Sequence, residues 1–179
     1  AASDVYKRQD FTPAELTYVI DQQHSHMANV LPMYSQLAER GQVELTTTPY
    51  YHPIMPLLMM DGWTFEDGIR VNKDAWPVDV TTHLTNGMNL FEEELGFRPN
   101  GMWPSEQAVS PPMVQPVSDV GIQWMVTDEE ILAKSTSEDG SSIDVEDAAK
   151  LATPWVVEGE NGGEVAVISV SYTHLRAHE

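Results

Sequence analysis

Apolar residues in the first part of the chain recur at the spacing of one helix face. This pattern runs from Met27 to Leu37, and Gly41 follows it as a stop signal. Pro32 lies inside the pattern and predicts a kink there. A β-branched run from Val43 to Thr48 comes next and ends at Pro49, which predicts that a strand follows the helix.

Helical and strand patterns then alternate twice more along the chain. A second helical face ends at Gly96 and comprises Val80, Leu84, Met88, Phe91 and Leu95. A short strand is expected from Gly101 to Trp103. Ser110 and Pro111 resemble an N-cap followed by proline at the first helical position, and the strand Ile122 to Thr127 follows this third helix.

Beyond these strands the sequence predicts an insertion and a hairpin. Residues 135–150 are polar and acidic, and we expect them to form a surface insertion. Residues 152–157 and 164–170 flank a glycine-rich turn, which is typical of a β-hairpin. The alternation of helices with strands predicts an α/β fold with a parallel sheet, and both an open sheet and a barrel fit it.

Both ends of the chain resemble translated adapter sequence. They are AASDVYKRQ at residues 1–9 and VSYTHLRAHE at residues 170–179, so the native part is expected at residues 10–169. The first nine residues lack the apolar run of a signal peptide, which makes the cytoplasm the first choice among compartments that the sequence leaves open.

The charge of the chain bears on its partners. Asp and Glu number 28 against 9 Lys and Arg, which gives a formal net charge of −19. Such a field repels phosphate backbones and anionic lipids but not a neutral sugar, so we expect neither nucleic acid nor a membrane as partner. The absence of cysteine excludes disulfides, zinc-thiolate sites and thiol nucleophiles. The oligomeric state stays open.

Polar clusters follow three of the predicted strands. They are PYYHP at residues 49–53, WPSE at 103–106 and DEE at 128–130. Loops after parallel strands converge on one rim, which is where α/β barrels bind their substrates. The three clusters therefore predict a site at that rim, although polar residues also follow strands for reasons of solubility alone.

Glu106 and Trp103 are the pair with the clearest chemistry. A carboxylate can attack an anomeric carbon and form a glycosyl ester, and an indole offers a flat apolar face to a sugar ring. The alternative is that Glu106 is an acid in the first turn of a helix, favoured by the helix dipole. The bare pattern leaves both interpretations open.

Other polar positions also have two interpretations each. His52, in a turn stiffened by two nearby prolines, either holds a sugar hydroxyl or is a structural histidine. Asp128 either bonds a sugar hydroxyl or caps the next turn. The spacing of His24 and His26 can chelate a metal but is more typical of a helix surface, so we expect no metal site.

Longer strings of residues resemble glycoside hydrolase family 57. GQVELTTTPYYHPIMPLL at residues 41–58 resembles one signature of that family, and GMWPSE at 101–106 resembles its nucleophile motif. WMVTDE at 124–129 continues as in amylopullulanase-type members. The resemblance covers about residues 11–168 and implies a partial (β/α)7 barrel of the glycoside hydrolase/deacetylase type, with residues 10–169 as the central part of a catalytic barrel.

The resemblance also implies a function and roles for single residues. The parent protein is expected to be a retaining glycosidase of the α-amylase or amylopullulanase type, which acts on an α-glucan or maltooligosaccharide without a cofactor. Glu106 matches the catalytic nucleophile. His52, Trp103 and Tyr51 match substrate-binding positions, and Asp128 is expected on the same rim.

Two family features have no match in the sequence. They are a histidine motif near the native start and the acid/base aspartate, expected beyond Val170, so the chain by itself is expected to be inactive. The alternatives are a 4-α-glucanotransferase, a branching enzyme or a non-catalytic sugar-binding barrel. A metal-dependent deacetylase on a related barrel needs paired histidines at helical spacing, and residues 10–169 contain none.

Overall fold

The computed structural model describes residues 11–59 and 75–171. The adapter-like residues 1–9 and 172–179 lie outside the described residues, as do residues 60–74. The chain forms two compact units, Ala1–Glu44 and Leu45–Glu179. Within the described ranges, no helix combines the length and the apolar character needed to cross a membrane.

The first unit contains two helices, α1 (Pro13–Ala28) and α2 (Val30–Glu39). A capping box starts α1, because the Glu15 amide donates to the Thr12 hydroxyl at 3.3 Å and the Thr12 amide donates to the Glu15 carboxylate at 2.8 Å. A proline follows at the first helical position. No helix was predicted before Met27, although Thr-Pro-Ala-Glu is the pattern of such a start.

A break at Asn29 separates the two helices. The sequence instead predicted a kink at Pro32. The Asn29 amide donates to the His26 carbonyl at 3.1 Å, and α2 begins at the next residue. Pro32 then lies in the first turn of α2, where a missing amide hydrogen costs no helical hydrogen bond. The ring of a proline crowds the carbonyl four positions earlier, which here belongs to the last residue of α1.

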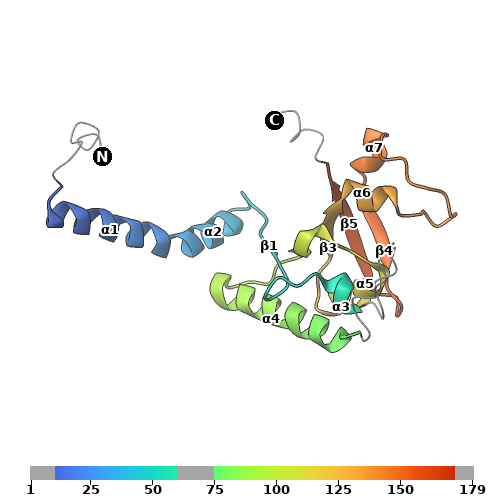
Figure 1. The fold of residues 1–179 in the computed structure, drawn as a ribbon, viewed down its shortest axis with the longest axis horizontal. Coiled ribbons are helices and arrows are strands. Elements are labelled where there is room, and N and C mark those ends of the chain that lie inside the picture. The colour runs from blue at the N-terminus through green and yellow to red at the C-terminus, as the bar shows by residue number, and fades with distance from the viewer. Residues whose placement is uncertain (1–10, 60–74, 172–179) are drawn as a thin grey trace, which may run out of the picture. The chain divides into compact units, whose positions relative to one another are not determined.

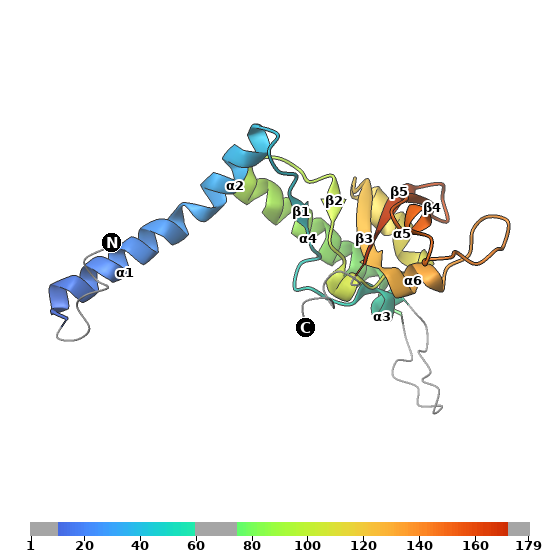
Figure 2. The same ribbon diagram turned by 90° about the horizontal axis from the view of Figure 1, so that it is seen from above.

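The second unit is built on a five-stranded sheet with the order β1-β2-β3-β5-β4, which can be followed in Figure 2 and places β4 and β5 beside β3 (Figure 1). Four strands run parallel, and β4 pairs antiparallel with β5. Their bounds are β1 (Thr46–Thr47), β2 (Gly101–Met102), β3 (Trp124–Asp128), β4 (Trp155–Glu158) and β5 (Glu164–Val170). The predicted α/β class and hairpin are confirmed, whereas the strand expected from Val43 to Thr48 is much shorter. Strand β5 includes Val170, the first residue of the adapter-like end.

The parallel strands are in register across the sheet. Thr47 pairs with Met102, and Met102 pairs with Met125. Gly101 lies against the indole of Trp124, and a Cβ on this glycine would come within 2.3 Å of that ring. Because the strands are parallel and in register, the polar segments that follow them leave the sheet at the same edge.

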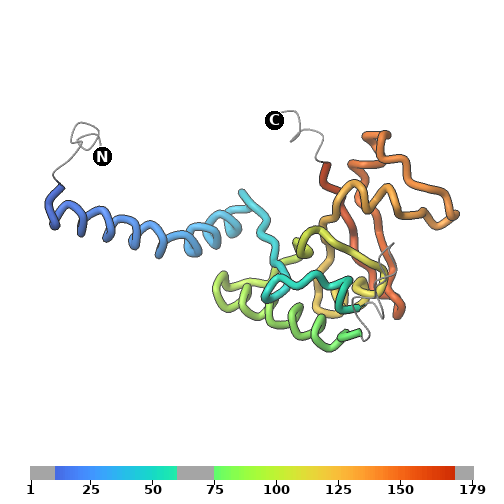
Figure 3. The backbone as a smooth tube through the Cα atoms, in the orientation of Figure 1, coloured from blue at the N-terminus to red at the C-terminus, as the bar shows by residue number. Residues whose placement is uncertain are grey.

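A methionine-rich core joins the sheet to α3 (Met55–Met59), α4 (Pro77–Leu95) and α5 (Pro111–Asp119). The core residues are all nearly inaccessible; they are Met55, Val80, Leu84, Met88, Met102, Met113, Val114, Val117, Ile122, Met125, Val165 and Val167. The predicted face of α4 is confirmed at Val80, Leu84 and Met88. The backbone that follows β1 runs alongside α4 (Figure 3). Flexible methionine side chains fill irregular gaps, which suits a core beneath such short strands.

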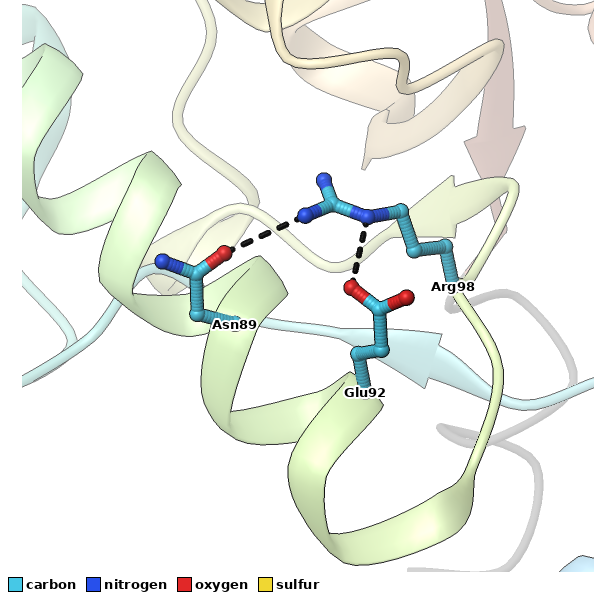
Figure 4. Close-up of polar contacts among 3 residues, drawn as sticks. All are labelled: Asn89, Glu92 and Arg98. Carbon is cyan, nitrogen blue, oxygen red and sulfur yellow. Dashed lines mark hydrogen bonds and ion pairs between the residues drawn. The ribbon is translucent and has the colours of Figure 1, made fainter.

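The ends of α4 and α5 follow the predicted signals. Gly96 ends α4 in the left-handed conformation, with a φ of 84°. The Arg98 guanidinium then donates to the Glu92 carboxylate at 2.8 Å and to the Asn89 amide oxygen at 3.2 Å (Figure 4). These exposed contacts tie the connection before β2 back to α4 and contribute about 0–1 kcal/mol.

Ser110 is the N-cap of α5 by its extended backbone, but its hydroxyl makes no capping bond.

The predicted acidic insertion follows the short helix α6 (Glu129–Ala133) and runs into a second one, α7 (Ala148–Leu151); it lies on the surface except at the buried Ile143. A tight turn in it closes on Asp139, whose carboxylate accepts the Ser137 hydroxyl at 2.8 Å and the Ser141 amide at 2.9 Å. Hydrogen bonds from Ser141, and then from Ser137, lower the pKa of Asp139 from 3.8 to about 2. The insertion is therefore locally ordered by its own polar side chains.

Gly87→Ala in α4 should destabilise the protein by about 1 kcal/mol. In a helix interior, alanine is more favourable than glycine by about 1 kcal/mol. However, a Cβ at Gly87 would come within 2.7 Å of the Thr48 carbonyl oxygen. Such overpacking costs about 1–3 kcal/mol. Urea unfolding followed by circular dichroism measures the difference. The matched control is Asn86→Ala at the exposed neighbouring position, which should be neutral or stabilising. Equal effects of the two variants would contradict a close approach of α4 to the end of β1.

Acidification should loosen the Asp139 turn. The folded pKa of about 2 lies below the ordinary value of 3.8, so the ionised form stabilises the turn above pH 3.8, and this contribution is lost as the pH falls through the folded pKa. The NMR chemical shift of the Ser141 amide follows this titration. Asp139→Asn keeps an acceptor oxygen without the charge and should remove the pH dependence. A wild-type midpoint at the ordinary value would show that the turn does not hold the carboxylate.

Candidate active site

The turn after β1 carries His52 in a strained backbone conformation. Tyr51 and His52 have φ angles of 61° and 54°. The His52 amide donates to the Pro49 carbonyl at 2.8 Å and closes the turn. Nδ1 of the His52 ring lies 2.9 Å from the Thr48 hydroxyl. When that hydroxyl donates, a neutral His52 carries its hydrogen on Nε2.

The turn after β2 carries Glu106 in the same type of conformation. It is a short 3₁₀ helix, η1 (Ser105–Gln107), in which Glu106 and Gln107 have φ angles of 55° and 54°. Glu106 is an acid in the first turn of this 3₁₀ helix but has a left-handed backbone, and α5 begins only at Pro111. The Glu106 side chain is 72% exposed, whereas Gln107 is buried.

The two turns meet at a histidine and a carboxylate. Nε2 of His52 lies 3.8 Å from Oε1 of Glu106, and the two form an ion pair whenever His52 is protonated. An open hollow of about 190 Å³ lies here and is lined by His52, Trp103, Glu106 and Gln107. The structure therefore brings together three of the predicted site residues, from segments far apart in the sequence.

Backbone strain is concentrated in these two turns. Among the described residues, the non-glycine residues with positive φ are Tyr51, His52, Glu106 and Gln107. Each such residue costs about 1–3 kcal/mol and persists only where surrounding contacts hold it. Strain on both partners of one contact indicates a positioned pair, because an incidental surface contact has no such requirement.

Hydrogen bonds from both neighbouring strands hold the Glu106 turn. The Thr127 hydroxyl on β3 donates to the Gln107 carbonyl at 3.0 Å, and Thr127 is buried. The Trp103 amide donates to the Thr47 carbonyl at 2.8 Å and extends the pairing of β1 with β2. The backbone around Glu106 is thereby fixed relative to β1 on one side and β3 on the other.

One exposed aromatic ring lines the hollow, and another belongs to the turn that carries His52. Trp103 lines it and is 41% exposed. Tyr51 is 85% exposed and lies outside the lining of the hollow. Its ring centroid is 4.5 Å from that of Tyr50 and 6.2 Å from that of His83, which it meets edge-on at 74°. Both exposed rings present apolar faces to the solvent, where a ligand can stack on them.

Asp128 lies at the end of β3 and caps the helix that follows. Its carboxylate accepts the Glu130 amide at 2.6 Å at the start of α6. Of the two interpretations that the sequence left open, the structure shows the cap. A sugar-binding role for Asp128 stays a prediction.

Two larger hollows, each of about 420 Å³, lie elsewhere on the second unit. One is lined by Ser118, Gly121, Ile122, Gln123, Val156, Glu164 and Ala166. The other is lined by residues of α6, α7 and their surroundings, including three glutamates. Neither lining includes a strained non-glycine residue or a histidine facing a carboxylate. The smaller hollow at Glu106 is therefore the better candidate site.

Within residues 11–59 and 75–171, no three histidine or carboxylate side chains lie close enough to hold a metal ion. His24 and His26 both lie on α1, where their spacing turns them to different sides of the helix.

Three residues around the site were missed by sequence reasoning. Gln107 lines the hollow, Thr127 holds its carbonyl, and His83 of α4 bonds the Tyr50 carbonyl behind the first turn. Only His83 gave a signal, because it interrupts the apolar face of α4 directly before Leu84. A polar residue in a loop or a strand does not reveal which backbone group it contacts.

Comparison with known proteins identifies one family. Residues 5–174 match the model of glycosyl hydrolase family 57. Over 93 residues the chain is 27% identical to α-amylase 1 of Dictyoglomus thermophilum, and the match covers 52% of this chain and 11% of the amylase.

Solved structures share the fold at low sequence identity. A family 57 branching enzyme from Thermococcus kodakaraensis has a TM-score of 0.60 at 15% identity, with 96% of this chain and 32% of that chain covered. A 4-α-glucanotransferase from Thermococcus litoralis has a TM-score of 0.56 at 17% identity, with 94% and 21% covered. This chain thus spans less than a third of each relative's length. The likeness confirms the predicted fold class, and strands β1, β2, β3 and β5 fit a partial (β/α)7 barrel.

Thr127→Val should loosen the Glu106 turn and destabilise the protein by about 1–2 kcal/mol, because it removes the hydroxyl that donates to the Gln107 carbonyl at nearly unchanged volume. Hydrogen exchange at the Gln107 amide, which donates to the Pro104 carbonyl at 2.9 Å, reports on the turn. Thr127→Ser keeps the hydroxyl and should preserve this protection even though it loses a methyl group. Faster exchange in the serine variant than in the valine variant would contradict the assignment.

Proposed function

Because this chain belongs to glycosyl hydrolase family 57, which it matches over residues 5–174, we propose that it is part of a retaining enzyme acting on α-glucans, with Glu106 as nucleophile. The observation that supports Glu106 best is the meeting of two strained turns at the His52–Glu106 contact. Such strain is typical of groups held for chemistry rather than for packing. The matching sequence WPSE at 103–106 supports the same residue.

The proposed reaction is a double displacement at the anomeric carbon. A carboxylate oxygen of Glu106 bonds to that carbon while the bond to the glycosidic oxygen breaks, and a carboxylic acid from elsewhere in the enzyme protonates the leaving oxygen. The resulting glycosyl ester is then opened by water, whose proton passes to the same acid/base group. The exposed carboxylate of Glu106 is open to a sugar on the solvent side.

The residues around Glu106 have proposed roles in holding the sugar. His52 faces Glu106 and can donate from Nε2 to a hydroxyl of the ring being cleaved. Trp103 lines the hollow and offers an apolar face to the same ring. Tyr51 precedes His52 in the same turn with its ring exposed and is proposed to contact the substrate further along. Asp128 is proposed to lie on the same rim, and its carboxylate also caps α6.

The hollow suits a single sugar ring. Its volume of about 190 Å³ is below the roughly 300–1,000 Å³ of pockets that enclose drug-sized ligands. An oligosaccharide therefore needs further surface, which we propose comes from the remainder of a longer enzyme. The acid/base carboxylate, about 5–5.5 Å from the nucleophile in retaining enzymes, is proposed to come from there as well. The 179 residues alone are then unable to complete turnover.

Hydrolysis and glycosyl transfer differ only in what opens the ester. Water gives hydrolysis, and a sugar hydroxyl gives transfer. The amylase, the glucanotransferase and the branching enzyme that resemble this chain represent both outcomes. The α-amylase or amylopullulanase type is proposed first, because the chain is 27% identical over 93 residues to an α-amylase.

A trapping experiment tests the nucleophile in the chain as it stands. An activated maltosyl fluoride loses fluoride without needing a proton, so the acid/base group is not required for the first step. A second fluorine on the sugar slows hydrolysis of the ester. We expect one maltosyl unit on the wild-type chain by intact-mass measurement, with peptide mapping to Glu106, and none on Glu106→Gln.

The matched control is Glu130→Gln, which removes an exposed carboxylate from α6 and should label like the wild type. Labelling of another carboxylate, or equal labelling of Glu106→Gln, would refute the assignment. Binding of maltooligosaccharide without any label would support the non-catalytic alternative. In a longer enzyme that carries the acid/base group, Glu106→Gln should lower the rate at least about a thousandfold.

A further inference from the structure

Helix α4 contacts the turn that carries His52 through His83. Nδ1 of the His83 ring forms a hydrogen bond with the Tyr50 carbonyl. The Tyr50 amide in turn donates to the backbone carbonyl of His83 at 3.0 Å. One residue of α4 thus binds both backbone groups of the residue that precedes the strained pair Tyr51 and His52.

The contact belongs to a close approach of α4 to the end of β1. Gly87, one helical turn after His83, leaves room for the Thr48 carbonyl where a Cβ would come within 2.7 Å of its oxygen. The Thr47 hydroxyl lies 3.5 Å from the Gly87 carbonyl. His83 is half-buried, and the Tyr51 ring meets its ring edge-on. The His83 ring is therefore held in place rather than free at the surface.

Backbone conformations such as those of Tyr51 and His52 relax unless neighbouring groups fix them. Within the turn itself, the His52 amide closes the loop and the His52 ring contacts Thr48. From α4, the described contact that fixes the carbonyl of Tyr50 is the one with the His83 ring. Rotation of that peptide group would turn His52 away from Glu106.

We propose that His83 is a positioning residue, whose Nδ1–H holds the Tyr50 carbonyl and so keeps His52 facing Glu106. Its importance for catalysis rests on the proposed function, whereas its effect on the geometry of the turn does not. His83 acts through the backbone of another segment, and nothing in the role requires it to touch a sugar.

The proposal requires a hydrogen on one particular nitrogen of the His83 ring. A carbonyl oxygen only accepts, so Nδ1 must carry a hydrogen. The neutral Nδ1–H tautomer and the imidazolium both meet this demand, and the Nε2–H tautomer does not. Long-range ¹H–¹⁵N correlation spectra of the wild-type chain distinguish them. A protonated Nδ1 on His83 is expected, and a bare Nδ1 overturns the proposal without any variant having to fold.

Two substitutions at His83 distinguish the loss of its hydrogen bond to Tyr50 from a general effect on the stability of α4. Asparagine places an amide N–H near the position of Nδ1, whereas leucine fills similar space without a donor. Protection of the His52 amide from hydrogen exchange should fall roughly three- to tenfold in His83→Leu and stay within about twofold of wild type in His83→Asn. Helix propensity alone ranks leucine above asparagine, so a merely structural effect on α4 gives the opposite order and overturns the proposal.

Maltotriose binding by isothermal titration calorimetry links this result to the proposed function. Weaker binding in His83→Leu, restored in His83→Asn, supports both proposals. If the exchange pattern is as expected but maltotriose does not bind the wild-type chain, the proposed function loses support while the positioning role of His83 stands. If maltotriose binds all three proteins alike and His52 exchange is unchanged, His83 has no such role.

Discussion

The parallel, in-register pairing of β1, β2 and β3 is the constraint on which the rest of the second unit depends. Thr47, Met102 and Met125 lie in one row across these strands. Since all three strands point the same way, the turns that follow them emerge together, and His52 and Glu106 can meet although they are far apart in sequence. A slip of one residue would turn each side chain to the other face of the sheet and separate the two turns.

Strands β1 and β2 are too short to hold this register by hydrogen bonds alone. The helices that pack against them supply the remainder, with α4 approaching the end of β1 at Gly87. Methionines from the sheet and from three helices fill the space between, and their flexible side chains tolerate irregular geometry. A core of this kind fixes the position of α4, which in turn supports the first turn of the site through His83.

Strain in the site is large relative to the stability of an ordinary domain. Four non-glycine residues with positive φ cost together about 4–12 kcal/mol, close to the whole free energy of unfolding of many proteins, about 5–15 kcal/mol. Buried hydrogen bonds to the backbone, such as that from Thr127 to Gln107, offset part of this cost. The rigid sheet beneath thus stabilises two turns that would relax in an isolated peptide.

The sequence by itself determined the α/β class, the apolar face of α4 and the candidate residues of the site. Apolar spacing gave α4, and Gly96 gave its end, because these signals act within one segment. The strings around His52 and Glu106 indicated the family and the candidate site residues for the same reason. Only the tertiary structure decided that Glu106 lies in a left-handed turn, and that Thr127 and His83 hold the two turns. These outcomes depend on contacts between segments far apart in the chain, which the pattern within any one segment does not encode.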